Sequence, residues 1–478
     1  MTMKMKMWVI VLFLMPLTHS HAQYPAVQTV MSQKGLNGVT QWITGWLQNN
    51  ISTILLPEVR GNVDIGIGSV SYVLHDMTIK RCDLPETSVV FSEGTGISLK
   101  LYGLTISISG LWNTQFGIIH DGGSFELSVY SISLVTMLEL GSDEERLTIS
   151  TVSCSALLGG VQVNFHGGGS FIIQPFIDMF SKRITEEIRQ KICPPFEQGI
   201  EALEKHLAVM PDAVNVDPYI YMNISLTDSP LVKSSGLGLS VKGEFYSITS
   251  PSEPPFSSEH FELPWQEDYM VTVGISEFCM NSAAYAYYCA GVLSIHITED
   301  MLPKISPIHL NTSQFGLLIP QLPKLYPDLP MELELYASKT PLFTFKESVI
   351  SVYVLASVKA FAIKTDSVAV PLFRLDMESS FSGKAYTETQ LLKGALEMNN
   401  FTMELGSTEI GEFQTGPIEQ MVKLAISTFA LPKVNAYLKK GVPLPSVKGF
   451  SIASSVTSIE NGFLAVALDL NGPSDDWR

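Results

Sequence analysis

The spacing of apolar residues changes near residue 167, and this change restricts the possible folds more than any other feature of the chain. Between residues 61 and 165, apolar and polar residues alternate along runs separated by Gly, Asp and Ser. This pattern is typical of long antiparallel strands with one apolar face. After the glycines at 167–169, apolar residues recur at every third or fourth position from about 176 to 207, which predicts a helix that Pro194 and Pro195 kink or briefly break. A coiled-coil seam would also fit this stripe, but packing across a curved sheet suits a strand-rich chain better.

The second half of the chain repeats this plan. Residues 418–438 carry another apolar stripe at helical spacing, which Pro432 is expected to bend, and residues 25–47 carry an earlier one. The turn-rich, proline-rich stretch 211–256 is interpreted as the connection between the halves. Further strand-like runs lie at 219–226, 237–246, 331–336, 349–361, 367–375, 395–405, 450–454 and 462–470. The sequence therefore predicts an α+β fold in which a strongly curved antiparallel sheet and a long helix are used twice.

The N-terminus has the three parts of a secretory signal peptide. Lys4 and Lys6 precede an apolar run at residues 7–17, and Ser20 and Ala22 provide the small residues that signal peptidase requires. The run is too short to span about 30 Å of hydrocarbon as a helix. We therefore expect residues 1–22 to be removed and the mature protein to be secreted to the extracellular space.

The composition limits the partners of the mature chain. It is 46% hydrophobic and only 16% charged, so either the cores are large or apolar surface lines a site for apolar ligands. The formal net charge is −17, and the loss of Lys4 and Lys6 makes it −19. Such a chain is a poor partner for nucleic acid and is not drawn to anionic membranes by charge. Its length exceeds the roughly 250–300 residues of one hydrophobic core, which predicts two domains.

Side chains for catalysis or metal binding are not grouped in any recognisable motif. The chain contains no G-x-S-x-G, H-E-x-x-H or Walker loop, and its nine histidines are scattered. We therefore expect no enzyme, no metal and no cofactor. The five cysteines include no C-x-x-C pair, and their odd number leaves at least one thiol unpaired within the chain. Four sequons for N-glycosylation, which support secretion only weakly, lie at Asn50, Asn223, Asn311 and Asn400.

Several segments resemble motifs of one known family. The most specific is residues 431–445, Leu-Pro-Lys-Val-Asn-Ala-Tyr-Leu-Lys-Lys-Gly-Val-Pro-Leu-Pro, and weaker ones occur in order at 242–246, 276–283, 290–293 and 319–327. Together they make the chain similar to the bactericidal/permeability-increasing and lipopolysaccharide-binding protein family, which includes the cholesteryl ester and phospholipid transfer proteins. The resemblance covers nearly the whole mature chain.

The resemblance implies two tandem barrel domains of strongly curved antiparallel sheet, joined through a central sheet and related by a pseudo-twofold axis into a boomerang. We place an N-terminal barrel at 23–212, a proline-rich connection with central-sheet strands at 213–256, and a C-terminal barrel at 257–478. Cys154 and Cys193 match the family's disulfide between a barrel strand and the second long helix. Two unrelated thiols are the alternative, but the expected positions on a strand and on its covering helix favour the bond.

In this family each half resembles a lipid cradle, with an apolar pocket between the barrel and its long helices. Most apolar helix stripes are core, and here we expect some residues to pack and others to contact acyl chains. The candidate lining residues are Trp42, Ile43, Phe176, Phe180, Ile184, Met421, Val422 and Phe429. The barrel-tip turn is a separate candidate, since its apolar side chains either enter a membrane interface or fold back on the barrel; they are Trp112, Phe116, Ile118 and Ile119.

The same turn departs from the bactericidal members of the family. Their turn is dense in lysine and contacts anionic lipopolysaccharide, whereas residues 108–120 contain no Lys or Arg, and the nearby Asp143-Glu144-Glu145 is opposed only by Arg146. The resemblance implies a secreted protein that holds phospholipid or lipopolysaccharide in apolar pockets and touches a membrane or micelle surface transiently, in innate antibacterial defence. The alternatives are a secreted phospholipid carrier without lipopolysaccharide recognition, which the charge favours, and a lipid-modifying enzyme, for which no nucleophile and base are evident.

Overall fold

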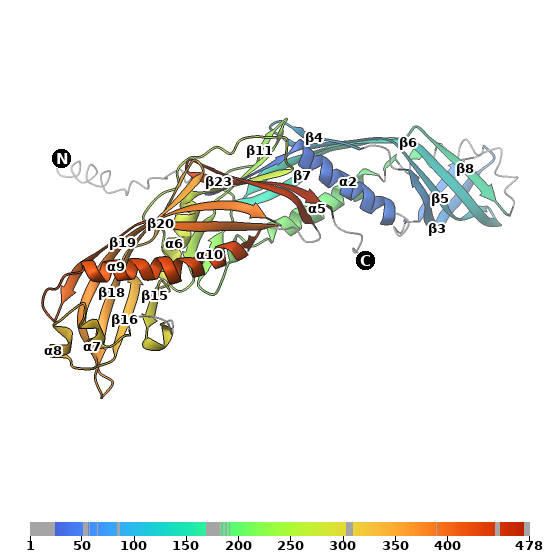
Figure 1. Ribbon diagram of the computed structural model, residues 1–478. Helices are drawn as coiled ribbons and strands as arrows, with labels where there is room; N and C mark the ends of the chain where they lie inside the picture. Colours follow the sequence, from blue (N-terminus) through green and yellow to red (C-terminus); the bar gives the residue numbers. More distant parts are fainter. Residues whose placement is uncertain are drawn as a thin grey trace, which may run out of the picture.

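The computed structural model describes residues 24–472 with several gaps. The residues left out are 1–23, 51–55, 57, 65, 84–86, 169–181, 183–184, 187–188, 191, 303–308, 389, 445–449 and 473–478, together with the side chains of 43, 45–50 and 195. The predicted signal peptide therefore lies outside the described residues. The described chain is elongated, with a large sheet at each end and a third sheet between them (Figure 1). None of the helices within the described ranges is long and apolar enough to cross a membrane.

The alternating residues of the first half form a seven-stranded antiparallel sheet. Its order is β2-β3-β5-β6-β7, with β4 paired to β5 and β8 paired to β6. The strands are β2 Val59–Asp64, β3 Ser69–Asp83, β4 Thr87–Ser92, β5 Gly96–Phe116, β6 Ile119–Asp143, β7 Arg146–Leu157 and β8 Gly160–His166. Because successive side chains of a strand point to opposite faces, one face gathers the apolar residues into a core that includes Trp112, Phe125 and Leu127.

The second half repeats most of this strand order, but its last strand, β21, pairs with β20, whereas β8 of the first half pairs with β6. The sheet of the second half runs β15-β16-β18-β19-β20-β21, with β17 paired to β18. The strands are β15 Ser294–Ile297, β16 Met331–Ala337, β17 Leu342–Lys346, β18 Val349–Ile363, β19 Ala369–Glu388, β20 Leu391–Thr408 and β21 Val442–Pro443. In both sheets a short strand (β4 or β17) pairs with the first part of a long strand, and the strand before it (β3 or β16) pairs with the second part. The predicted repetition of one plan is therefore visible in the strand order.

The prediction of closed barrels is wrong, because both large sheets keep open edges throughout the described residues. The long strands change partners midway: β5 pairs with β4 over residues 96–101 and with β3 over residues 105–115. In β6, Ser131 has a positive φ of 54°, and β8 pairs before it while β7 pairs after it. The long strands therefore pair with β3 and β8 at one end of the sheet and with β4 and β7 at the other end. A closed barrel instead needs one set of strands in which the first pairs with the last.

A six-stranded sheet joins the two halves, as expected. Its order is β11-β12-β1-β14-β23-β22. The strands are β11 Leu231–Lys233, β12 Gly236–Val241, β1 Val27–Ser32, β14 Val271–Ser276, β23 Phe463–Asn471 and β22 Ser451–Glu460. At the centre β1 and β14 pair antiparallel, and each leads directly into a helix, α2 Gln33–Asn50 or α6 Glu277–Cys289. The hairpin β11–β12 flanks β1, and the hairpin β22–β23 flanks β14. The order hairpin, central strand is therefore the same when the sheet is followed inward from either edge.

Among the remaining elements, the first helix begins later than predicted. Residues 27–32, predicted to begin the first helix, form β1 because Val27, Thr29 and Val30 favour strand and pair on both sides. Residues 189–190 are helical, Ile192 is in a turn, and α5 Cys193–Ala208 begins with Pro194 and Pro195 in its first turn, where proline is tolerated, so the predicted break at the two prolines is confirmed. The last predicted helix consists of α9 Gly416–Ala425, the π-helical turn η4 Ile426–Ala430 and α10 Leu431–Lys440. Smaller elements are β9 Ala213–Asn215, β10 Ile220–Asn223, β13 Glu244–Ser247, η3 Glu299–Met301, α7 Thr312–Phe315 and α8 Leu322–Leu325.

Candidate functional site

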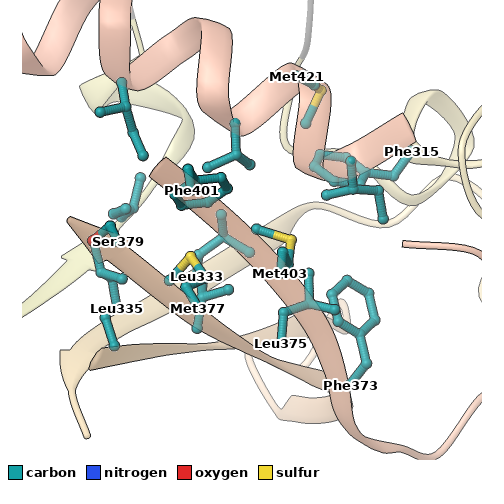
Figure 2. Close-up of a pocket in the computed structure, with 16 residues that line it drawn as sticks. Phe315, Leu333, Leu335, Phe373, Leu375, Met377, Ser379, Phe401, Met403 and Met421 are labelled. Carbon is teal, nitrogen blue, oxygen red and sulfur yellow. The ribbon is translucent and has the colours of Figure 1, made fainter. Parts of the chain in front are cut away.

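An apolar cavity lies between the sheet of the second half and the helix that crosses it (Figure 2). Its volume is about 280 Å³. Fifteen of its sixteen lining side chains are apolar, and they come from β15, β16, β18, β19, β20, α7, α9 and η4. The cavity is therefore bounded by one face of a curved sheet and one face of a helix.

Two periodicities place the lining side chains. On the strands, alternate residues point to the same face, which brings Leu333 with Leu335 and Phe401 with Met403 to the cavity. On α9, residues three and four positions apart share a face. The helical side of the lining consists of Ile418, Met421, Val422 and, from η4, Ile426.

The chemistry of this lining suits a hydrocarbon chain. The one hydroxyl, Ser379 Oγ, donates a hydrogen bond to the Val354 carbonyl at 3.4 Å, and none of the sixteen residues is acidic, basic or histidine. Such a surface offers burial and dispersion contacts but no charge and no proton transfer. Three of the side chains are methionines, Met377, Met403 and Met421, whose flexible thioethers adapt to irregular apolar shapes.

The predicted lining residues fall in different places. Met421 and Val422 line the cavity, whereas Phe429 is half-buried on η4 and does not. Trp42, on α2, packs edge-on against Phe450 with ring centroids 4.6 Å apart. The other four lie beyond what the structure describes, as whole residues or as a side chain: Phe176, Phe180, Ile184 and Ile43. Sequence reasoning missed Ile418 as lining, although it stands three residues before Met421 in the same stripe, and it named none of the strand residues.

The tip candidates also separate. Trp112 is only 1% exposed, and its indole Nε1–H donates to the Ser124 carbonyl at 3.0 Å, so its prediction as a membrane-tip residue is wrong. The physical reason is the alternation of β5, which points Trp112 into the core. Phe116 is half-buried at the end of β5, while Ile118 and Ile119 in the following turn are 96% and 62% exposed.

The acidic turn does not belong to this tip. It follows β6 at the end opposite to Ile119, because β6 runs along β5 from the tip to residue 143. There Glu145 forms an ion pair with Lys242 at 2.7 Å, and Arg146 donates to the Ala208 carbonyl at 3.0 Å. The expectation that this turn makes the tip acidic is therefore wrong, since the turn is docked on the connection between the halves.

The predicted disulfide is confirmed. Cys154 on β7 and Cys193 at the start of α5 are bonded, with their Cα atoms 5.9 Å apart and a sequence separation of 39. Cys82, Cys279 and Cys289 are free thiols.

The sequons differ in accessibility. Asn400 is exposed on β20, Asn223 and Asn311 are half-buried, and the side chain of Asn50 lies outside the described atoms. The side chain of Asn311 caps α7 by accepting a hydrogen bond from the Ser313 N–H at 2.8 Å. Glycan attachment at these sites stays a prediction.

Fold and cavity together define a class: an α+β protein with two sheets of similar strand order, a shared central sheet, and an apolar cavity beneath a long helix. The chain belongs to the LBP / BPI / CETP family. The model of that family's N-terminal domain matches residues 35–203, and the model of its C-terminal domain matches residues 214–471.

Individual relatives match almost end to end. The bactericidal permeability-increasing protein of Sebastes schlegelii is 33% identical over 466 residues, which cover 97% of this chain and 98% of that protein. The lipopolysaccharide-binding protein of Homo sapiens is 27% identical over 92% of each chain. A crystal structure of lipopolysaccharide binding protein superposes with a TM-score of 0.59 and 25% identity, covering 94% of this chain and 99% of the other.

Proposed function

We propose that this protein is a secreted lipid-binding protein that holds the hydrocarbon chains of phospholipid or lipopolysaccharide-type amphiphiles in apolar pockets. The observation that carries the proposal is the apolar cavity of about 280 Å³. This volume lies just below the roughly 300–1,000 Å³ of typical ligand pockets, so it suits a hydrocarbon chain with its headgroup left outside. Each methylene removed from water contributes about 0.8 kcal/mol, and a stretch of roughly ten therefore contributes about 8 kcal/mol.

The names of the relatives support a role in innate antibacterial defence, because they refer to lipopolysaccharide binding and to bactericidal action. The repeated strand order supports a second pocket in the first half, with Trp42, Ile43, Phe176, Phe180 and Ile184 as its candidate lining. On this proposal the halves are the domains 23–212 and 257–478, which residues 213–256 join into a pseudo-twofold boomerang. Secretion follows from the signal peptide at 1–22, and contact with a membrane or micelle surface is transient.

A phospholipid carrier that does not recognise lipopolysaccharide is the second candidate, and one observation favours it. The two turns of the tip and the strand ends that carry them, residues 61–79, 108–131 and 158–168, contain no Lys or Arg, while Arg60 on β2 is ion-paired with Glu58 at 3.0 Å. Anionic sugar phosphates are recognised mainly by such cations. Competition between lipopolysaccharide and phosphatidylcholine for the purified protein distinguishes the two candidates.

The test is the lipid that copurifies with the mature protein from a eukaryotic secretory host in the absence of detergent. We expect mass spectrometry of the denatured protein to release a stoichiometric phospholipid. In A356F, a phenyl ring on β18 would fill the cavity, and the lipid content should fall by one equivalent.

The control is L355F, which adds the same ring on the opposite face of the same strand and should keep its lipid. A wild-type protein that is empty and takes up no added phospholipid contradicts the proposal. So does A356F protein that carries as much lipid as L355F.

A further inference from the structure

Two neighbouring turns present large aliphatic side chains at the free end of the first sheet. Ile67 follows β2 and is 81% exposed, while Ile118 and Ile119, described above, join β5 to β6. The turns are adjacent, because β3 pairs with β5 up to Ser71 and Gln115. A Cβ atom at Gly68 would come within 2.7 Å of the Phe116 ring, which shows how closely the first turn approaches the second.

Strand pairing holds this group, here called the isoleucine tip (Ile67, Ile118 and Ile119), in place. The hairpin is tight, with Phe116 pairing to Ile119 and Gly117 at a positive φ of 58°. Behind it the core around Trp112 and Phe165 fixes the strand ends, and the two rings pack edge to face with their centroids 5.6 Å apart. The exposed side chains therefore stand on a rigid base, and little conformational entropy is lost when they enter another phase.

Charge decides which surface this tip fits. Residues 61–79 and 108–131 around it contain no Lys or Arg, the nearby Arg60 of β2 is ion-paired with Glu58, and the acidic turn lies at the other end of β6. Asp64, the nearest acidic residue before Ile67, accepts a hydrogen bond from the Gly66 N–H at 2.8 Å and stays in the turn. An anionic surface would gain nothing electrostatically from contact with this tip. A zwitterionic lipid surface gains from the burial of isoleucine and demands no counter-charge.

We propose that the isoleucine tip docks the protein on zwitterionic lipid surfaces, such as phosphatidylcholine bilayers, by inserting Ile67, Ile118 and Ile119 among the headgroups. This inference rests on the proposed function, because a protein that loads a lipid chain must reach an aggregate that supplies it. Docking is driven by apolar burial, so it does not depend on anionic lipid and persists at high salt.

The experiment measures binding of the full mature protein to phosphatidylcholine vesicles by flotation, at low and at high salt. I118S and I67S should each weaken partitioning roughly tenfold, which is the effect of losing one buried isoleucine. The matched control is L317S, since Leu317 is 89% exposed near α7 in the other half. L317S should bind vesicles as the wild type does, and thermal unfolding should report the same fold for all four proteins.

A second measurement separates this proposal from the pocket. Uptake of a short-chain phosphatidylcholine, supplied as monomers below its micelle concentration, should be unchanged in I118S and I67S. Wild-type protein that takes up these monomers but does not float with vesicles overturns the tip while the pocket stands. Equal loss in L317S, or binding that requires anionic lipid and disappears at high salt, also overturns it. So does a tip-dependent dimer of the free protein, because the tip would then serve a second copy of the chain.

Discussion

At the residue scale, Cys279 shows how burial controls the chemistry of one side chain. It packs beneath Ala26 and Phe278 where α6 meets the start of β1, and burial raises the pKa of its thiol to about 12 from an ordinary 9.0. Only the thiolate is nucleophilic, and a raised pKa leaves it scarce at pH 8. We therefore expect Cys279 of the folded protein to resist a maleimide reagent at pH 8, while the half-buried Cys289 is labelled first.

Peptide mapping by mass spectrometry gives the order of labelling. In urea all three free cysteines should react alike, which shows that the fold and not the local sequence protects Cys279. If Cys279 were labelled as fast as Cys289 under native conditions, the contact between α6 and the first strand would have to open readily.

The tip shows what single residues reveal in the sequence. The family resemblance located the exposed turn at Ile118 and Ile119 without a strand register, so Trp112 was counted with them. A register needs the partner strands, and these are known only once β3 and β6 are paired. For the same reason Ile67 could not be joined to the turn, since about fifty residues separate them and only the β3–β5 pairing brings them together.

At the element scale, prediction succeeded where one face of an element is apolar. The long strands and the helix at 416–440 were found because they pack on one side only. Residues 27–32 were assigned to a helix because β1 is paired on both sides by strands more than two hundred residues away. The helix α6 was missed because it has no clean stripe: Asn281 and Ser282 are buried on it beside Phe278, and Ser276 caps it.

The link between β7 and α5 carries the prediction that belongs to this scale. The disulfide from Cys154 to Cys193 closes a loop with a sequence separation of 39 residues, and loop-closure entropy gives it about 4 kcal/mol of stabilisation. The double variant C154A/C193A should therefore unfold at lower urea, with a slope that is somewhat steeper because its unfolded chain is no longer cross-linked, and reductant should shift the wild type but not the variant. Replacing Cys82, which is a free thiol, serves as the control. Coincident urea transitions for the double variant and the wild type would contradict this role.

At the scale of the whole molecule, the central sheet is what makes one protein of two repeats. Lys34, just after β1, forms an ion pair with Asp469 of β23 at 2.8 Å, so the beginning and the end of the described chain meet there. The core beneath this sheet likewise takes Val30 from one half and Phe261 and Phe463 from the other. Two domains are predicted from length alone, but length carries no information about a sheet that both halves build together.

This junction predicts that neither half folds well alone. A fragment of residues 257–478 keeps β14, β22 and β23 but lacks β1, so β14 becomes an unpaired edge and Phe261 loses Val30. Open apolar edges associate, and we expect this fragment to form soluble aggregates on its own.

Refolded together with residues 23–256, the fragment should give a one-to-one complex through the β1–β14 pairing, as measured by light scattering after size exclusion. In T29P the centre of β1 loses a backbone donor, and the complex should not form. The control T249P lies in the exposed loop after β13, where the Thr249 N–H donates no backbone hydrogen bond among the described residues, and it should leave the complex intact. A monomeric 257–478 fragment with its own cooperative unfolding transition would mean that the repeats are independent and that the central sheet only joins them.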